Sequence, residues 1–128
     1  MRVLLDTHAL LWAVLAPGSL SRRGAAIVAD EKNQILVSAA SAWEIATKVR
    51  LGKLPGAEVL EREFLAVMEE AGYTLLPIEA AAALRAGRLV AEHRDPFDRV
   101  LAAQALEEDM PILSADAQLD AFGVRRLW

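Results

Sequence analysis

The stretch RVLLDTHALLW, residues 2–12, places one acidic side chain between two apolar segments. The first segment, Arg2–Leu5, is apolar without alternation after its first residue, which is typical of a strand buried on both faces of a parallel sheet. A helix is expected to follow over residues 8–16, with Asp6 or Thr7 as its cap. In open parallel sheets, ligands bind at the carboxyl ends of the strands, where the strand order reverses. Asp6 is therefore expected to lie at a ligand-binding edge.

Strand and helix patterns alternate along the rest of the chain. Further strands are expected over residues 34–38, 73–76, 111–114 and 124–127. A second helix is expected from Ser19 or Ser21 to residue 30, and further helices over residues 41–51, 58–71, 79–90, 96–108 and 117–121. This alternation predicts an α/β fold in which a central parallel sheet of about five strands is flanked by helices on both faces. The chain shows no linker, internal repeat or low-complexity segment, so a single domain over residues 1–128 is expected.

Two helix starts carry specific signals. Ser41 and Glu44 have the spacing of a capping box, which predicts that Ser41 begins a helix with Glu44 in its first turn. Asp95 is expected to cap a later helix whose first residue is Pro96. Between them, the apolar spacing over residues 58–71 predicts one amphipathic helix, whose apolar stripe consists of Val59, Leu60, Phe64, Val67 and Met68.

The composition excludes several classes of protein. The chain has no cysteine, which excludes a disulfide framework and a thiolate zinc site. The net charge of −4, from 14 basic and 18 acidic residues, is unlike that of most nucleic-acid binders. If four of the acids share one metal site, the other 14 balance the 14 bases. No apolar run reaches the 18 residues of a membrane span, and residues 1–3 lead straight into a predicted strand rather than into the apolar region of a signal peptide. A cytoplasmic protein without membrane contact is therefore expected.

Four acidic residues follow predicted strands or lie near the starts of predicted helices: Asp6, Glu44, Asp98 and Asp116. Strands of a parallel sheet end at the same edge, so these side chains can be brought together there. Carboxylates forced together repel one another and raise each other's pKa values. A divalent cation relieves this repulsion, and oxygen ligands suit Mg²⁺ or Mn²⁺. A water made more acidic by such a cation could attack a phosphodiester.

Each acid also has an ordinary structural explanation. Glu44 could form a capping box with Ser41 or an ion pair with Lys48. Asp98 could interact with the dipole of its helix, and Asp116 could cap the short helix that follows it. From the spacing alone, both kinds of explanation stay open.

Four segments resemble the PIN-domain family, and in particular the VapC-type toxin ribonucleases. They are LLDTHALLW (residues 4–12), SAASAWEIATKVRLGKL (38–54), HRDPFDRVLAAQA (93–105) and ILSADAQLDAFG (112–123). They occur in the family's order and cover nearly the whole chain. The resemblance implies a PIN-like fold and a metal-dependent endoribonuclease that uses Mg²⁺ or Mn²⁺ and acts as a toxin.

The resemblance also implies roles for individual residues. The family's catalytic and metal-binding acids match Asp6, Glu44, Asp98 and Asp116. Asp98 matches better than Asp95, because alanines at positions 102, 103 and 105 follow it in the family's pattern. Many relatives carry a further acid where this chain has Gln118, so the match is less complete around Asp116.

Three more residues match positions near these acids and are expected to bind substrate. Ser114 matches a hydroxyl near the fourth acid, and Thr7 is expected to help in the same way. Arg99 is expected to contact a phosphate or to form a salt bridge. His93 is expected to be a loop residue. The larger aromatic side chains are expected to be core residues or to line a groove: Trp12, Trp43 and Phe64.

The implied partners are an RNA substrate, commonly structured RNA such as tRNA, a small antitoxin that blocks the site, and a second copy of the chain in a homodimer. Two alternatives stay open. One is a non-catalytic PIN-like module that binds RNA or a protein. The other is a phosphotransferase or hydrolase that forms an aspartyl-phosphate at Asp6. His8 disfavours the latter, because the haloacid-dehalogenase pattern has an aspartate at that position.

Overall fold

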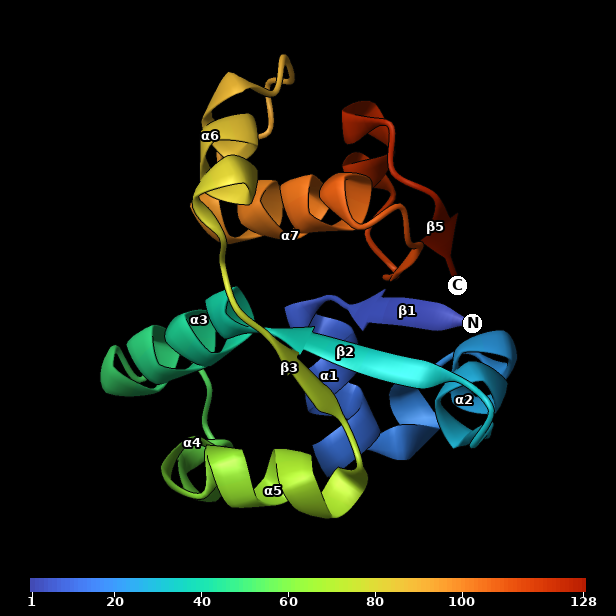
Figure 1. Ribbon diagram of the computed structural model, residues 1–128. Helices are drawn as coiled ribbons and strands as arrows, with labels where there is room; N and C mark the ends of the chain where they lie inside the picture. Colours follow the sequence, from blue (N-terminus) through green and yellow to red (C-terminus); the bar gives the residue numbers. More distant parts are fainter.

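The computed structural model describes residues 1–128 and contains a five-stranded sheet with the strand order β3–β2–β1–β4–β5. The strands are β1 (Arg2–Leu5), β2 (Gln34–Ser38), β3 (Thr74–Leu76), β4 (Ile112–Leu113) and β5 (Arg126–Leu127). Every neighbouring pair is parallel, which confirms the predicted sheet. The chain adds β2 and β3 on one side of β1 and then returns to add β4 and β5 on the other (Figure 1). The strand order therefore reverses beside β1, where Asp6 follows the strand.

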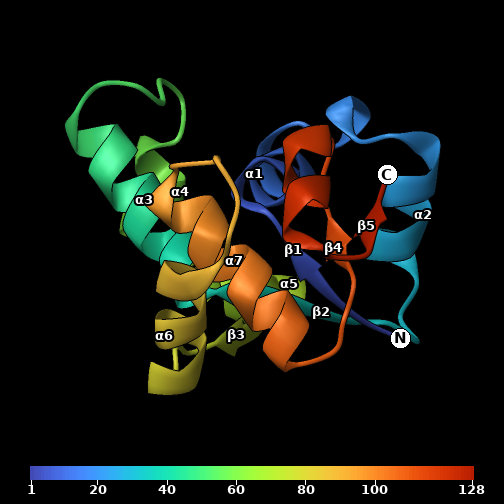
Figure 2. The same ribbon diagram turned by 90° about the horizontal axis from the view of Figure 1, so that it is seen from above.

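Helices cover both faces of this sheet, as predicted. They are α1 (Thr7–Leu15), α2 (Arg22–Ala29), α3 (Ala39–Arg50), α4 (Glu58–Arg62), α5 (Phe64–Ala71), α6 (Ala80–Arg88) and α7 (Pro96–Glu107), with the short 3₁₀ helices η1 (Pro17–Ser19) and η2 (Ala117–Phe122). Figure 1 shows α1, α2, α4 and α5 below the sheet and α6, α7 and η2 above it. Figure 2 shows α3 beside α7, with which it is in contact. No helix has the length and apolar character needed to cross a membrane.

The alternation of side chains along the strands divides the core into two parts. Val3 and Leu5 pack on the face covered by α1, α2 and α5. Leu4 points to the other face, where it packs with Leu101 of α7 and Leu119 of η2. All five side chains are fully buried, so β1 is covered on both faces and the residue that follows it is held rigidly.

The capping box predicted at Ser41 is wrong. α3 begins at Ala39, directly after β2, and its cap is Ser38, whose hydroxyl oxygen accepts a hydrogen bond from an amide of the first turn at 2.9 Å. Ser41 lies inside the helix, and its hydroxyl is hydrogen-bonded to that of Thr7 at 3.0 Å. Glu44 consequently lies in the second turn of α3, not in the first.

The single helix predicted over residues 58–71 is two helices, α4 and α5. They are separated at Glu63, whose backbone angles (φ −102°, ψ 19°) end α4. The predicted apolar stripe is kept across this break by Leu60, Phe64 and Met68, which are all buried. Val59 was expected on the same stripe but is 60% exposed. Successive residues of a helix point about 100° apart around its axis, so Val59 points away from the side on which Leu60 is buried.

Candidate active site

Asp6 lies at the carboxyl end of β1 and is 5% exposed. Its carboxylate accepts a hydrogen bond from the Ala9 amide at 2.7 Å, which caps α1 as predicted, and a second from the Ser114 hydroxyl. Burial raises the pKa of the Asp6 carboxyl, the hydrogen bonds from Ser114 and Ala9 oppose that rise, and the charge of Asp98 adds to it. Asp6 is therefore a buried carboxylate held in a fixed orientation near a second acid.

Ser114 connects Asp6 to Asp116. It follows β4 and is fully buried, and its hydroxyl oxygen accepts a hydrogen bond from the Asp116 amide at 3.0 Å while the hydroxyl donates to Asp6. The exposed Asp116 side chain caps η2 by accepting a hydrogen bond from the Gln118 amide at 2.9 Å. The Ser114 hydroxyl, which the sequence places near Asp116, is thus hydrogen-bonded both to the Asp116 backbone and to the Asp6 side chain.

Glu44 projects from the second turn of α3 and is 3% exposed. Its Oε2 accepts a hydrogen bond from Lys48 Nζ at 2.5 Å, which is the ion pair weighed from the sequence. Burial lowers the pKa of Lys48, but the hydrogen bond and charge of Glu44 outweigh it and raise that pKa. Glu44 Oε1 is buried and has no hydrogen-bond partner. A buried acceptor without a partner is costly, so this oxygen is free to bind a ligand atom or a cation.

Asp98 lies in the first turn of α7, which Asp95 caps as predicted. Burial raises the pKa of the Asp98 carboxyl, the hydrogen bond with His93 opposes that rise, and the charges of Asp95 and Glu44 add to it. The charge of Asp98 in turn raises the pKa of Asp6. Asp98 therefore interacts with acids that come from β1 and from α3.

His93 was expected to be a loop residue, and it does lie in the loop before α7, but its ring faces the acids. His93 Nε2 is 2.7 Å from Asp98 Oδ2, and one ligand atom from each of His93, Asp98 and Asp116 lies within 4.8 Å of the others. The sequence carries one signal for this arrangement. His93 precedes the cap Asp95 by only two residues, so its side chain can reach back to Asp98 in the first turn of the helix.

Arg99 fixes the loop that carries His93. Its guanidinium donates hydrogen bonds of 2.5–3.3 Å to the backbone oxygens of Ala86, Leu89, Ala91 and His93. It also lies over the ring of Phe122, at 5.7 Å from the centroid. These donors are used inside the protein, and the expected contact of Arg99 with a substrate phosphate stays a prediction. The same holds for Thr7, which is 3% exposed and hydrogen-bonded to Ser41.

The donor set at this edge fits a hard divalent cation. Of the four acids that the sequence selects, Asp98 and Asp116 place ligand atoms within 4.8 Å of each other. Asp6 and Glu44 lie close enough for Asp98 to raise the pKa of Asp6 and for Glu44 to raise the pKa of Asp98. Carboxylate oxygens are the ligands that Mg²⁺ and Mn²⁺ prefer, and the free Glu44 oxygen offers an additional position. A positive charge would also relieve the repulsion among the carboxylates. Which of the four bind a cation stays a prediction.

A model of the PIN domain matches residues 3–124. The chain belongs to the PIN domain family. The match extends over nearly the whole chain and confirms the family resemblance of the four sequence segments. Among curated proteins, this PIN domain is similar to Ribonuclease VapC16 of Mycobacterium tuberculosis (strain ATCC 25618 / H37Rv). The two are 70% identical over 33 residues, which make up 26% of this chain and 23% of that protein.

Solved structures share the fold of this PIN domain over its full length. The structure of VapBC2 from Rickettsia felis, bound to a DNA fragment from its promoter, has a TM-score of 0.73 at 13% identity and covers 100% of this chain and 99% of that chain. The structure of VapBC-1 from nontypeable Haemophilus influenzae has a TM-score of 0.69 at 15% identity and covers 99% of this chain and 97% of that chain. At these identities the likeness shows the PIN fold alone.

Proposed function

We propose that this PIN domain is an endoribonuclease that depends on Mg²⁺ or Mn²⁺ and acts as the toxin of a toxin–antitoxin pair. The observation that carries the proposal is the free oxygen of the buried Glu44, which lies in one region with three further carboxylates. The similarity to a protein named Ribonuclease VapC16 supports RNA as the substrate. The similarity to VapBC structures supports an antitoxin as the partner.

The chain's own residues would prepare the site in a defined way. The cation, when bound, supplies charge neutralisation for the phosphodiester and activation of a water. Ser114 and the Ala9 amide orient Asp6 toward the shared region, and Lys48 holds one oxygen of Glu44 so that the other stays free. The charge of Asp98 acts on Asp6, the charge of Glu44 acts on Asp98, and the hydrogen bond between Asp98 and His93 limits the rotation of Asp98. Asp116 completes the set from the solvent side.

The proposed substrate is RNA with accessible single-stranded loops, of which tRNA is one kind, because unpaired bases and backbone can be reached there. The proposal includes a homodimer, a small antitoxin that covers the site, and a cytoplasmic location, where RNA and antitoxin meet the toxin. An aspartyl-phosphate at Asp6 is disfavoured, because the Ala9 amide and the Ser114 hydroxyl already bind the two oxygens of this buried carboxylate.

Incubation of the purified protein with end-labelled total RNA tests this function. We expect cuts that require Mg²⁺ or Mn²⁺ and that fall by about a hundredfold or more in Asp98→Asn and Glu44→Gln, a loss of roughly 2.7 kcal/mol of transition-state stabilisation. Asp109→Asn is the matched control, because the Asp109 side chain is 99% exposed. Folded protein that cuts no RNA with either metal, yet still binds RNA, would favour the non-catalytic module instead.

A second readout does not depend on cleavage. If the acids hold a cation, Mn²⁺ at about 100 times its Kd adds about 2.7 kcal/mol to the free energy of unfolding. Glu44→Gln and Asp98→Asn should lose most of this gain, while Asp109→Asn should keep it. An equal gain in all four proteins would place the bound cation elsewhere.

A further inference from the structure

A cavity adjoins the candidate active site on the side of β1 and β4. Its volume is about 330 Å³, and it is lined by Asp6, His8, Trp12, Ala115 and Asp116. This volume lies at the lower end of the range for small-molecule sites, roughly 300–1,000 Å³. Two of the lining residues belong to the proposed metal site, so a molecule in the cavity would lie next to a phosphate held there.

The aromatic side of the cavity is a row of three rings. The ring centroids of His8 and Trp12 are 5.9 Å apart, and those of Trp12 and Trp128 are 5.6 Å apart. Trp128 packs against the core, close to Gly24, where an added Cβ would lie 3.6 Å from its ring. Trp12 is only half-buried and packs against neither core, so its ring is supported from behind by Trp128 and accessible at the cavity.

His8 extends this row into solvent. The residue is exposed, and its ring takes part in no hydrogen bond or ion pair. An aromatic pair that is fixed at one end and open at the other offers a face on which a planar group can stack. Of the two alternatives that the sequence left open for Trp12, a core residue or the lining of a groove, the structure favours the second, because Trp12 lines the cavity.

The charges around the cavity determine what it can hold. Asp6 and Asp116 line it, and no Lys or Arg does, so an anion would be repelled there. A nucleobase is planar and neutral, and it stacks on aromatic side chains in proteins that bind single strands. In RNA it is also joined through one sugar to the phosphate that the neighbouring acids would hold. A base next to the scissile phosphate meets each of these conditions.

We infer that this cavity is a nucleobase-binding subsite, in which Trp12 and His8 stack on a base that flanks the scissile phosphate. The inference rests on the proposed ribonuclease function for its role in cleavage. It assigns Trp12 and His8 to substrate binding, a role that the carboxylates alone do not supply. It also predicts that removal of either ring weakens RNA binding more than it slows the cleavage of RNA that is already bound.

Steady-state cleavage of the RNA cut by the wild-type protein tests this role. Trp12→Leu should raise KM about tenfold, within the range measured for stacking on one base, and change kcat by less than about threefold. Trp12→Phe keeps a ring and should restore most of the affinity. His8→Ala removes an exposed side chain without disturbing the core and should raise KM about threefold. Unchanged KM in Trp12→Leu and His8→Ala, with cleavage intact, would overturn the subsite and leave the nuclease standing.

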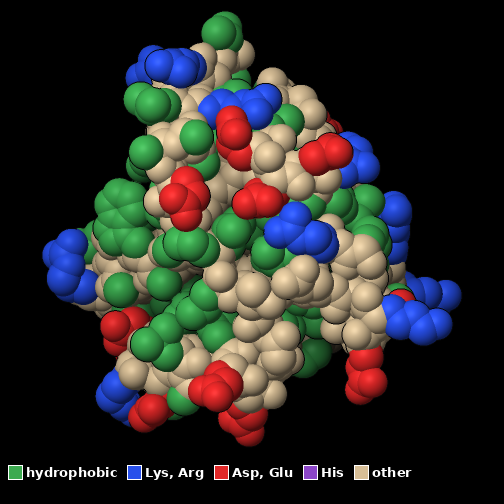
Figure 3. Space-filling model, in the orientation of Figure 1, with side chains coloured by type: hydrophobic (Ala, Val, Ile, Leu, Met, Phe, Trp, Pro, Cys, Tyr) green, Lys and Arg blue, Asp and Glu red, His purple; other side chains and the backbone are tan.

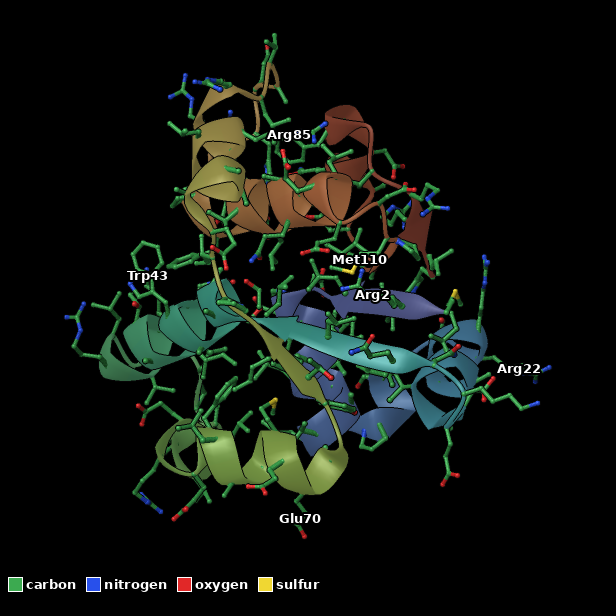
Figure 4. The ribbon with its side chains drawn as sticks, viewed as in Figure 1. Arg2, Arg22, Trp43, Glu70, Arg85 and Met110 are labelled. Atoms are coloured by element: carbon green, nitrogen blue, oxygen red, sulfur yellow. The ribbon has the colours of Figure 1, made fainter.

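The matched control is Trp43→Leu. Trp43 is 57% exposed on α3, where it packs edge-on against Phe97 with a centroid distance of 4.6 Å, and it does not line the cavity. Figure 4 shows its ring projecting from α3. Its substitution should leave KM within about twofold of the wild-type value. A rise in KM equal to that of Trp12→Leu would mean that loss of any exposed tryptophan weakens binding, and it would overturn the assignment of the cavity.

Binding of nucleosides separates the subsite from the nuclease function. Adenosine, guanosine, cytidine and uridine carry no phosphate, so they can be titrated into metal-free protein while the three indole N–H signals are followed by NMR. We expect at least one nucleoside to shift the Trp12 signal more than the Trp43 signal, and Trp12→Leu to abolish the binding. If the protein cuts no RNA but this shift is seen, the nuclease fails and the subsite stands. No shift with any nucleoside overturns the subsite.

Discussion

Asp98 is the residue on which the electrostatics of the site converge. It is hydrogen-bonded to His93, its pKa is raised by burial and by Asp95 and Glu44, and its own charge raises the pKa of Asp6. Such mutual repulsion makes the cation-free site unfavourable for the fold. Ionised Asp6 and Asp98 thus destabilise the fold, and a bound cation would remove that cost.

Asp6→Asn tests this cost in metal-free protein. The folded protein binds a proton at Asp6 more readily than the unfolded chain does, because burial raises the folded-state pKa above the ordinary 3.8. The ionised carboxyl therefore destabilises the fold above its folded pKa, and this effect disappears as the pH falls toward the unfolded value. Asparagine can still cap α1, so Asp6→Asn should be more stable than wild type at neutral pH, by about 1 kcal/mol.

Urea unfolding in EDTA at several pH values measures this difference. We expect the advantage of Asp6→Asn to shrink as the pH is lowered toward the ordinary value of 3.8, because the wild-type carboxyl takes up its proton in the folded protein before it does so in the unfolded chain. Asp30→Asn is the control, because Asp30 lies at the exposed end of α2. If the stability difference between Asp6→Asn and wild type did not change with pH, Asp6 would have the same pKa in the folded protein as in the unfolded chain, and burial would not raise it.

At the scale of the elements, Arg99 joins the end of α6 and the loop over residues 89–95 to α7. Four hydrogen bonds to backbone oxygens converge on one guanidinium. Lysine has a single nitrogen and cannot replace this fork. Arg99→Lys should therefore destabilise the protein by about 2–3 kcal/mol, since several half-buried backbone oxygens lose a charged donor.

Hydrogen exchange locates this effect. In Arg99→Lys, amides of residues 89–95 should exchange markedly faster, whereas those of β1 and β2 should change only with global stability. Arg94→Lys is the matched control, because Arg94 is exposed and forms no hydrogen bond. If residues 89–95 kept their protection in Arg99→Lys, the loop would owe its position to other contacts, and the Asp98–His93 pair would not depend on Arg99.

The elements also show which features are predictable from local sequence. The bounds of β1 and β2 agree with the expected ones, because continuous apolar runs between polar ends have few alternatives. The start of α3 was missed, since Ser38 and Ser41 both suit a cap and the choice depends on the contact of Ser41 with Thr7, far away in the chain. His93 was missed for the same reason, because its place depends on the hydrogen bonds of Arg99. The four acids were selected because each follows a strand or lies near the start of a helix, and their role in a metal site stays a prediction.

At the scale of the whole molecule, the distribution of charge limits how the proposed RNA substrate can be bound. The chain carries a net charge of −4, and on the face in Figure 3 the Lys and Arg side chains are dispersed among Asp and Glu. Such a surface neutralises few phosphates. If RNA is the substrate as proposed, its affinity must come from the proposed cation at the carboxylates and from the inferred stacking on Trp12 and His8, neither of which requires a long row of phosphate contacts.

The salt dependence of RNA binding tests this division. Each phosphate neutralised on a single strand contributes about −0.7 to the slope of log K against log salt concentration, so we expect a slope of only about −1 to −2 at constant Mn²⁺. The measurement uses the cleavage substrate with a phosphorothioate at the scissile position. Arg22→Gln, which removes an exposed positive charge from α2, should leave the slope unchanged. A slope of about −5 or steeper would mean that many basic side chains contact the backbone, and stacking would then be a minor contribution.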